Sequence, residues 1–155
     1  MGIFSNVLFA ADYDLTITAR DGSIPDANVA AVRRFIEGGG IFTVATGRSR
    51  SPLAGDPERI MTNAPHIVEA QCIGTSKGIA ARKLAELFGR SVLVCAGDAK
   101  NDLSMLKEAD LAYVPADGDS SLFAYGFRTA AACSDGAIAS IVEDLAASAA
   151  GKEGI

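Results

Sequence analysis

The stretch from Val7 to Thr16 places five mostly apolar residues directly before two aspartates, Asp12 and Asp14. A short apolar run of this kind is typical of a buried strand in a parallel sheet. The two acids then stand at the carboxyl end of that strand, which is the edge where open α/β sheets bind ligands. Two carboxylates about 5 Å apart repel each other by roughly 3 kcal/mol at an effective dielectric constant of about 20. Another part of the chain must offset this repulsion.

Apolar runs alternate with helical patterns along the rest of the chain. The alternation predicts strands over residues 5–11, 41–45, 66–70, 91–96, 110–114 and 127–132. Helices are expected from Pro25 to the glycines at 38–40, over 77–88, near 100–108 and around 138–145. In the second helix we expect Ser76 to cap the N-terminus, and a buried face made of Ile79, Leu84, Leu87 and Phe88. This alternation predicts an α/β fold with a doubly wound parallel sheet.

Length and composition narrow the class of protein. A chain of 155 residues with 49% hydrophobic and 21% charged residues fits one globular core, over 1–150, followed by a flexible tail at 151–155. The net charge of -5 argues against a nucleic-acid partner. No apolar run approaches the roughly 18 residues of a membrane span. Three widely spaced cysteines, an odd number, favour reduced thiols and a cytoplasmic protein.

Three further motifs carry polar groups at the ends of predicted strands or at a helix start. Thr46 and Gly47 follow the strand over 41–45, where a hydroxyl and backbone N–H groups can bind a phosphate. Lys77 begins a helix, a place where the helix dipole disfavours a cation, so a nearby anion is expected. The run 97–102, Gly-Asp-Ala-Lys-Asn-Asp, again follows a buried strand. Alone, the first two are more often a helix cap and a solvated surface lysine.

Together these motifs bring carboxylates to one edge of the predicted sheet. The four acids are Asp12, Asp14, Asp98 and Asp102. With one lysine among them, the cluster has a net charge of about -3, which a divalent cation would neutralise. Oxygen ligands without histidine or cysteine favour Mg²⁺ over zinc or iron. A magnesium ion beside a lysine, a hydroxyl and a free carboxylate suits phosphoryl transfer.

The motifs D-x-D-x-T, A-T-G-R, S-K-G and G-D-x-x-N-D, in this order, resemble those of the haloacid dehalogenase superfamily of phosphatases, most of all its Cof-like branch. The resemblance implies a Rossmann-like α/β/α core with sheet order 3-2-1-4-5 and the strand over 127–132 added at the far edge. It implies that Asp12 is the nucleophile and Asp14 the general acid and base. It implies a phosphate site formed by Thr46, Gly47, Lys77 and Asn101. It also implies a magnesium site formed by the Asp12 carboxylate, the Asp14 backbone carbonyl and Asp98, with Asp102 in support.

The chain departs from this family at two places. Leu15 stands where the family usually has glycine. Cof-like enzymes also carry a type IIB cap between the threonine and lysine motifs, whereas only 31 positions separate Thr46 from Lys77 here. The cap insertion expected between about 64 and 76 is therefore missing. Either the chain is naturally capless or its cap has been deleted.

The leading hypothesis is a magnesium-dependent phosphomonoester hydrolase that forms an aspartyl-phosphate. In its capped form its substrates would be sugar phosphates or similar small phosphorylated metabolites, with no nucleic-acid or membrane partner. The alternative is a capless phosphate-binding or regulatory module with little turnover. A two-component receiver domain fits less well, because its phosphoacceptor follows a middle strand. Oligomerisation could cover the open site.

Overall fold

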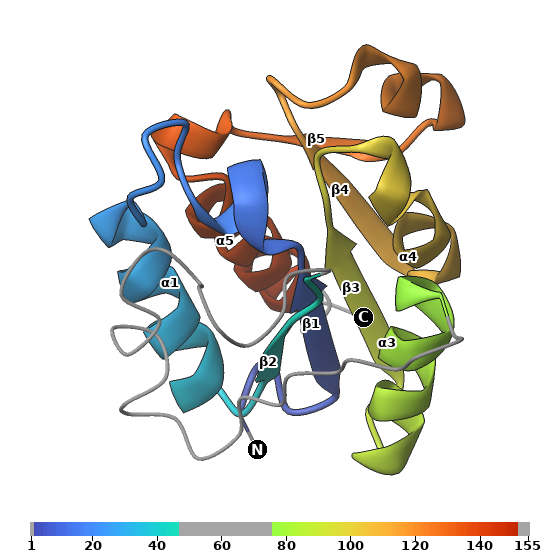
Figure 1. The fold of residues 1–155 in the computed structure, drawn as a ribbon. Helices are drawn as coiled ribbons and strands as arrows, with labels where there is room; N and C mark the ends of the chain where they lie inside the picture. Colours follow the sequence, from blue (N-terminus) through green and yellow to red (C-terminus); the bar gives the residue numbers. More distant parts are fainter. Residues whose placement is uncertain (1, 47–75, 152–155) are drawn as a thin grey trace.

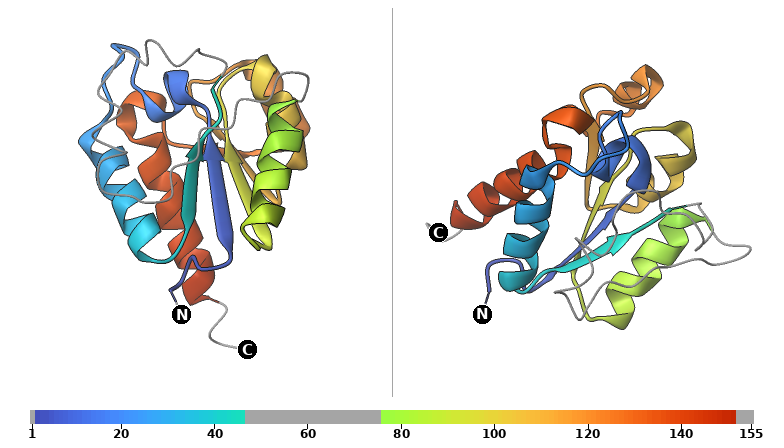
Figure 2. Two further views of the ribbon diagram at one scale, coloured as in Figure 1. Left: turned by 60° about the horizontal axis from the view of Figure 1, so that its bottom comes forward. Right: turned by 60° about the vertical axis from the view of Figure 1, so that its left-hand side comes forward.

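The computed structural model describes residues 2–46 and 76–151, which form a five-stranded parallel sheet with helices on both faces (Figure 1 and Figure 2). The strands are β1 (Val7–Ala11), β2 (Ile41–Val44), β3 (Val92–Ala96), β4 (Leu111–Pro115) and β5 (Arg128–Ala130). Their order across the sheet is β2-β1-β3-β4-β5. The predicted α/β fold is confirmed, and the strand predicted over 127–132 lies at the far edge, as expected. The strand predicted over 66–70 lies outside the described residues.

Two pairs of helices cover the sheet. Helices α1 (Asp26–Glu37) and α5 (Ala137–Ala150) pack together on one face, and α3 (Lys77–Leu87) and α4 (Leu103–Glu108) pack together on the other (Figure 2). Short helical turns connect these elements: η1 (Tyr13–Ile17), η2 (Lys100–Asp102), η3 (Ser120–Tyr125) and η4 (Cys133–Asp135). Among the described residues, no helix has the length and apolar character needed to cross a membrane.

Strand β1 is the centre of the hydrophobic core. All five of its residues are buried, because successive side chains point to opposite faces and both faces are covered. Phe9 packs against the α1 and α5 side, where its ring meets those of Phe35 and Phe42 edge-on at centroid distances of 5.9 and 5.1 Å. Leu8 faces α3 and α4. This burial confirms the interpretation of the apolar run that ends at Asp12.

The predictions for the first and last helices hold with a small shift. Helix α1 begins at Asp26, and Pro25 is its N-cap rather than its first helical residue. The helix expected around 138–145 is α5, whose large apolar residues are all buried: Ile138, Ile141, Val142 and Leu145. In α1 the buried apolar residues are Val29, Ala31, Val32 and Phe35.

The prediction for α3 is only partly right. Ser76 caps the helix as expected, because its hydroxyl accepts a hydrogen bond from the Ile79 N–H at 3.2 Å. Of the predicted buried face, however, only Leu84 is buried. Ile79, Leu87 and Phe88 are 45%, 78% and 37% exposed.

The close approach of α3 to α4 explains this difference. A Cβ atom on Gly78 would lie 2.2 Å from the backbone carbonyl oxygen of Ser104, so that position has no room for a side chain. The neighbouring buried positions of α3 are the small residues Ala81 and Ala85. Because the contact with α4 selects small residues, Ile79 and Leu87 of α3 remain exposed. The glycine of the S-K-G motif thus has a packing role.

Candidate active site

The carboxyl ends of β1 and β3 bring Asp12 and Asp98 together. Ala11 pairs with Ala96 across the parallel ladder, and the Asp12 N–H donates to the Ala96 carbonyl at 2.9 Å. The residues that follow each strand therefore leave the sheet side by side. Asp12 is buried and Asp98 half-buried. This is the edge at which parallel α/β sheets bind ligands.

Lys77 lies between two of the carboxylates. Its ammonium group is 2.6 Å from Asp12 Oδ1 and 2.6 Å from Asp102 Oδ1. Lys77 is the first residue of α3, where the helix dipole disfavours a cation. The two carboxylates provide the anionic partner that this position predicted, and the lysine offsets part of their mutual repulsion.

Asp102 is fully buried, and donors surround it. Its Oδ2 atom accepts hydrogen bonds from the backbone N–H groups of Asp98 and Ala99, both at 3.2 Å, while Oδ1 faces Lys77. A Cβ atom on Gly97 would lie 2.5 Å from Asp102 Cβ. The glycine before Asp98 therefore allows the buried carboxylate to approach the chain that carries Asp98.

The carboxylates of Asp12, Asp98 and Asp102 could together hold a metal ion. One oxygen from each lies within 4.8 Å of the others. Three carboxylates beside one lysine leave excess negative charge, and an all-oxygen donor set suits a hard cation such as Mg²⁺. The resemblance placed Asp102 in a supporting role, whereas the structure puts its carboxylate in the same cluster as Asp12 and Asp98.

The electrostatics of this cluster favour a bound cation. Burial, reinforced by the charge of Asp102, raises the pKa of Asp12 from 3.8 to about 6, against the opposing effect of Lys77. Burial and the charge of Asp102 likewise raise the pKa of Asp98 to about 6. Burial acts to lower the pKa of Lys77, but the charge of Asp12 and the hydrogen bonds to both carboxylates outweigh it and raise that pKa. A cation bound here would favour the ionised form of the acids.

Asp14 lies in η1, directly beyond the end of β1. The backbone of Asp14 is extended, with φ -74° and ψ 132°, and Leu15 then adopts φ 54° and ψ 14°. This left-handed conformation costs a side-chain-bearing residue about 1–2 kcal/mol relative to the right-handed one. It explains physically why glycine suits position 15. Asp14 is half-buried and stands outside the cluster formed by Asp12, Asp98 and Asp102.

The remaining predicted site residues differ in how far the structure describes them. Thr46 is buried and follows β2 at the same edge of the sheet, because the Ala45 N–H continues the ladder to the Ala11 carbonyl at 2.9 Å. Asn101 is exposed in η2, beside Asp102. Gly47 lies outside the described residues, as does the interval between about 64 and 76 where a cap insertion was expected.

Asn28 supports the turn that carries Asp14, a role that no motif in the sequence indicated. Its fully buried side chain donates to the Ile17 carbonyl at 3.0 Å and accepts from the Ala139 N–H at 3.1 Å. It thus joins η1 to the start of α5. The available signal was its spacing, since Asn28 stands four and seven residues before the buried Val32 and Phe35 and so lies on the apolar face of α1.

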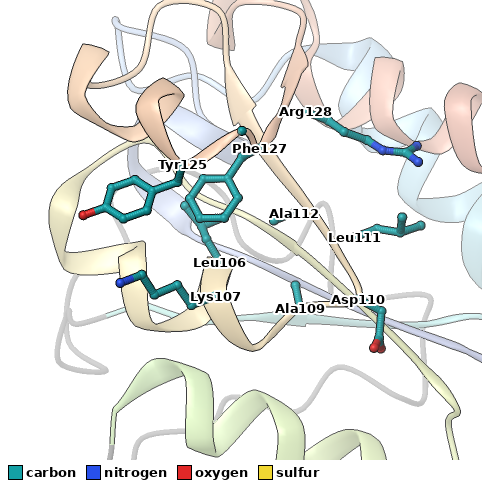
Figure 3. A pocket seen from close by; sticks show the side chains of 10 residues that line it. Leu106, Lys107, Ala109, Asp110, Leu111, Ala112, Tyr125, Phe127 and Arg128 are labelled. Atoms are coloured by element: carbon teal, nitrogen blue, oxygen red, sulfur yellow. The ribbon is translucent and has the colours of Figure 1, made fainter.

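A cavity of about 430 Å³ lies elsewhere, between α4 and the first residues of β4 and β5 (Figure 3). Figure 3 shows Tyr125 and Phe127 side by side, and the Lys107 ammonium lies 4.8 Å from the centre of the Tyr125 ring. Because the sheet is parallel, the starts of β4 and β5 lie at the edge opposite the carboxylates. The acid cluster, and not this cavity, therefore lies at the edge where parallel α/β sheets bind ligands.

A known protein family matches the part of the chain that contains several residues of the acid cluster. The family model of haloacid dehalogenase-like hydrolases matches residues 50–141, more than half of the chain and a span that includes Lys77, Asp98 and Asp102. The chain belongs to the haloacid dehalogenase-like hydrolase family. No curated protein matches this hydrolase.

Solved structures share the fold of this haloacid dehalogenase-like hydrolase at low sequence identity. A hypothetical protein from Xanthomonas campestris is 19% identical, with a TM-score of 0.76 over 97% of this chain and 85% of the other. The 3-deoxy-D-manno-octulosonate 8-phosphate phosphatase of Yersinia pestis is 16% identical. Its TM-score is 0.76 over 99% of this chain and 86% of the phosphatase. The Moraxella catarrhalis phosphatase of the same name was solved with magnesium, phosphate and KDO and is 20% identical. Its TM-score is 0.72 over 93% of this chain and 86% of the phosphatase.

Proposed function

We propose that this hydrolase cleaves phosphomonoesters with the help of Mg²⁺ and through an aspartyl-phosphate on Asp12. The observation that carries the proposal is Lys77, held 2.6 Å from both Asp12 and Asp102 beside the third carboxylate of Asp98. The lysine is positioned to neutralise a phosphoryl group that approaches Asp12. The membership in a hydrolase family and the phosphatases among the structural neighbours support the same reaction.

In the first half of the proposed reaction, an Asp12 carboxylate oxygen attacks phosphorus, and the bond from phosphorus to the ester oxygen breaks. Asp14 gives its proton to the departing oxygen. Lys77 and the Thr46 hydroxyl hold the phosphoryl oxygens, and the family resemblance assigns Gly47 and Asn101 to the same phosphate site. In the second half, Asp14 takes a proton from water, the water oxygen attacks phosphorus, and Asp12 leaves as a free carboxylate with release of phosphate.

The residues that would hold Mg²⁺ are the Asp12 and Asp98 carboxylates and the Asp14 backbone carbonyl, with Asp102 beside them. When bound, the ion would neutralise charge on the phosphoryl oxygens. The all-oxygen cluster supports this assignment, and one structural neighbour was solved with magnesium.

We propose further that the chain is a capless member related to the Cof-like branch and acts on small sugar phosphates or similar metabolites. The three neighbours described above are matched over 85–86% of their own lengths, which supports a core without a large additional domain. Two of them are named for an acidic sugar phosphate. A site without a cap excludes water poorly, so we expect low specificity and slow turnover unless a second subunit covers it. The free, buried Cys95 and Cys133 support a cytoplasmic location.

Hydrolysis of phosphate esters in the presence of Mg²⁺ tests this function. The wild-type protein should release phosphate over many turnovers, and Asp12→Asn should reduce the rate to background. Glu143→Gln, on the exposed face of α5, is the matched control and should retain the wild-type rate. Unchanged activity in Asp12→Asn would refute the mechanism, whereas binding of phosphate without turnover would favour the regulatory module.

A further inference from the structure

The side chain of Thr18 makes two hydrogen bonds within the turn that carries Asp14. The Thr18 hydroxyl accepts a hydrogen bond from the Leu15 N–H at 3.2 Å and donates one to the Tyr13 carbonyl, also at 3.2 Å. The Thr18 N–H donates to the same carbonyl at 3.0 Å. Thr18 is 3% exposed, so water competes little for these bonds. The hydroxyl thus bridges the two residues that flank Asp14.

The conformation of Leu15 explains why such a bridge is needed. Its left-handed backbone is unfavourable for a residue that carries a side chain, and buried hydrogen bonds stabilise the conformation in which they form. The two bonds of the Thr18 hydroxyl therefore act against the strain at Leu15. Without them, the peptide between Asp14 and Leu15 could rotate toward an ordinary conformation. That rotation would redirect the Asp14 side chain and carbonyl together.

We propose that Thr18 is a positioning residue that orients Asp14 for proton transfer to the leaving group. The inference rests on the proposed function, because it concerns the general-acid role of Asp14. It explains the orientation of Asp14 by a side chain whose hydrogen bonds go to the backbone of the residues on either side of it. Proton transfer requires the acid to lie within hydrogen-bond distance of the departing oxygen, so a small rotation of the turn should slow it.

The leaving group provides the test. An alkyl phosphate needs a proton on its departing oxygen, whereas 4-nitrophenyl phosphate expels a stable phenolate. We expect Thr18→Val to lower kcat/KM by about tenfold or more for an alkyl phosphate and by less than about threefold for 4-nitrophenyl phosphate. Thr18→Ser, which keeps the hydroxyl, should restore the alkyl phosphate rate. Thr129→Val is the matched control, since Thr129 is exposed in β5 at the far edge of the sheet.

Thr18→Val can also be measured in a Leu15→Gly background. This comparison separates an effect on the turn from a general loss of folded protein. Glycine adopts the left-handed conformation readily, so Thr18→Val should cost less in that background than in the wild type. Equal losses on both phosphates, or no loss on either, would overturn the inference while leaving the phosphatase function intact. A wild-type protein that hydrolyses neither compound would instead refute the proposed function, and the role of Thr18 with it.

Discussion

Replacement of Asp98 by asparagine should stabilise the metal-free protein at neutral pH. Burial and the charge of Asp102 raise the pKa of Asp98 from 3.8 to about 6, so its ionised form is less favourable in the folded state than in the unfolded state. The stability that Asp98 contributes is fully present below pH 3.8 and is lost as the pH rises through about 6. Asparagine has the same shape and no charge to lose.

The size of the stabilisation expected from Asp98→Asn follows from the raised pKa of Asp98. A displacement of about two pKa units corresponds to about 3 kcal/mol, and solvent screening of the half-buried side chain reduces this to about 1–2 kcal/mol. Asp98→Asn should therefore raise the free energy of unfolding by about 1–2 kcal/mol at pH 7 in EDTA. The gain should fall by about half at pH 5, because the wild-type carboxyl is then largely protonated in the folded state.

Urea unfolding followed by circular dichroism measures this difference, with and without Mg²⁺. A ligand that binds only the folded state stabilises it, so Mg²⁺ should stabilise the wild type and have little effect on Asp98→Asn. Glu143→Gln removes a charge from the exposed face of α5 and should change neither result. A variant that is less stable than the wild type at pH 7 in EDTA, or a gain that is equal at pH 5 and pH 7, would refute this reasoning.

Two further substitutions test the support of the site. Asn28→Ala should lower the free energy of unfolding by about 2–4 kcal/mol in urea unfolding, because it leaves two buried backbone groups unpaired. As the control, Asn6→Ala removes an exposed 3.5 Å contact with Ser91 and should change the free energy of unfolding by less than about 0.5 kcal/mol. Equal effects of the two substitutions would contradict the role of Asn28. Gly97→Ala should displace Asp102 and weaken Mg²⁺ binding by about 10- to 100-fold in calorimetric titration. Unchanged affinity would show that the close approach at Gly97 is unimportant.

The parts of the fold that depend on pattern were predictable. Alternating apolar runs and helical periods identified all five strands of the described sheet, and the boundaries moved by no more than two residues. The polar groups that follow Ala11 and Ala96 could be placed together because parallel strands end at one edge. The place of Lys77 at a helix start predicted a nearby anion, and its ammonium group lies 2.6 Å from both Asp12 and Asp102.

The parts that depend on distances between elements were not predictable. Hydrophobicity placed Ile79 and Leu87 in the core, but the tight contact between α3 and α4 at Gly78 leaves them exposed. In the sequence, no motif distinguishes Asn28 or Thr18 from other polar residues. Their roles arise from the carbonyl and N–H groups of a turn whose conformation the sequence alone did not specify.

The central claim is that Asp12 carries the phosphoryl group during turnover. The protein would be mixed with Mg²⁺ and 4-nitrophenyl phosphate, quenched in acid within one turnover and digested, and its peptides mapped by mass spectrometry. We predict one phosphoryl group on the peptide that contains Asp12, and none in Asp12→Asn. A turning-over protein whose Asp12 peptide stays unmodified, or whose phosphoryl group lies on another residue, would contradict the proposed mechanism.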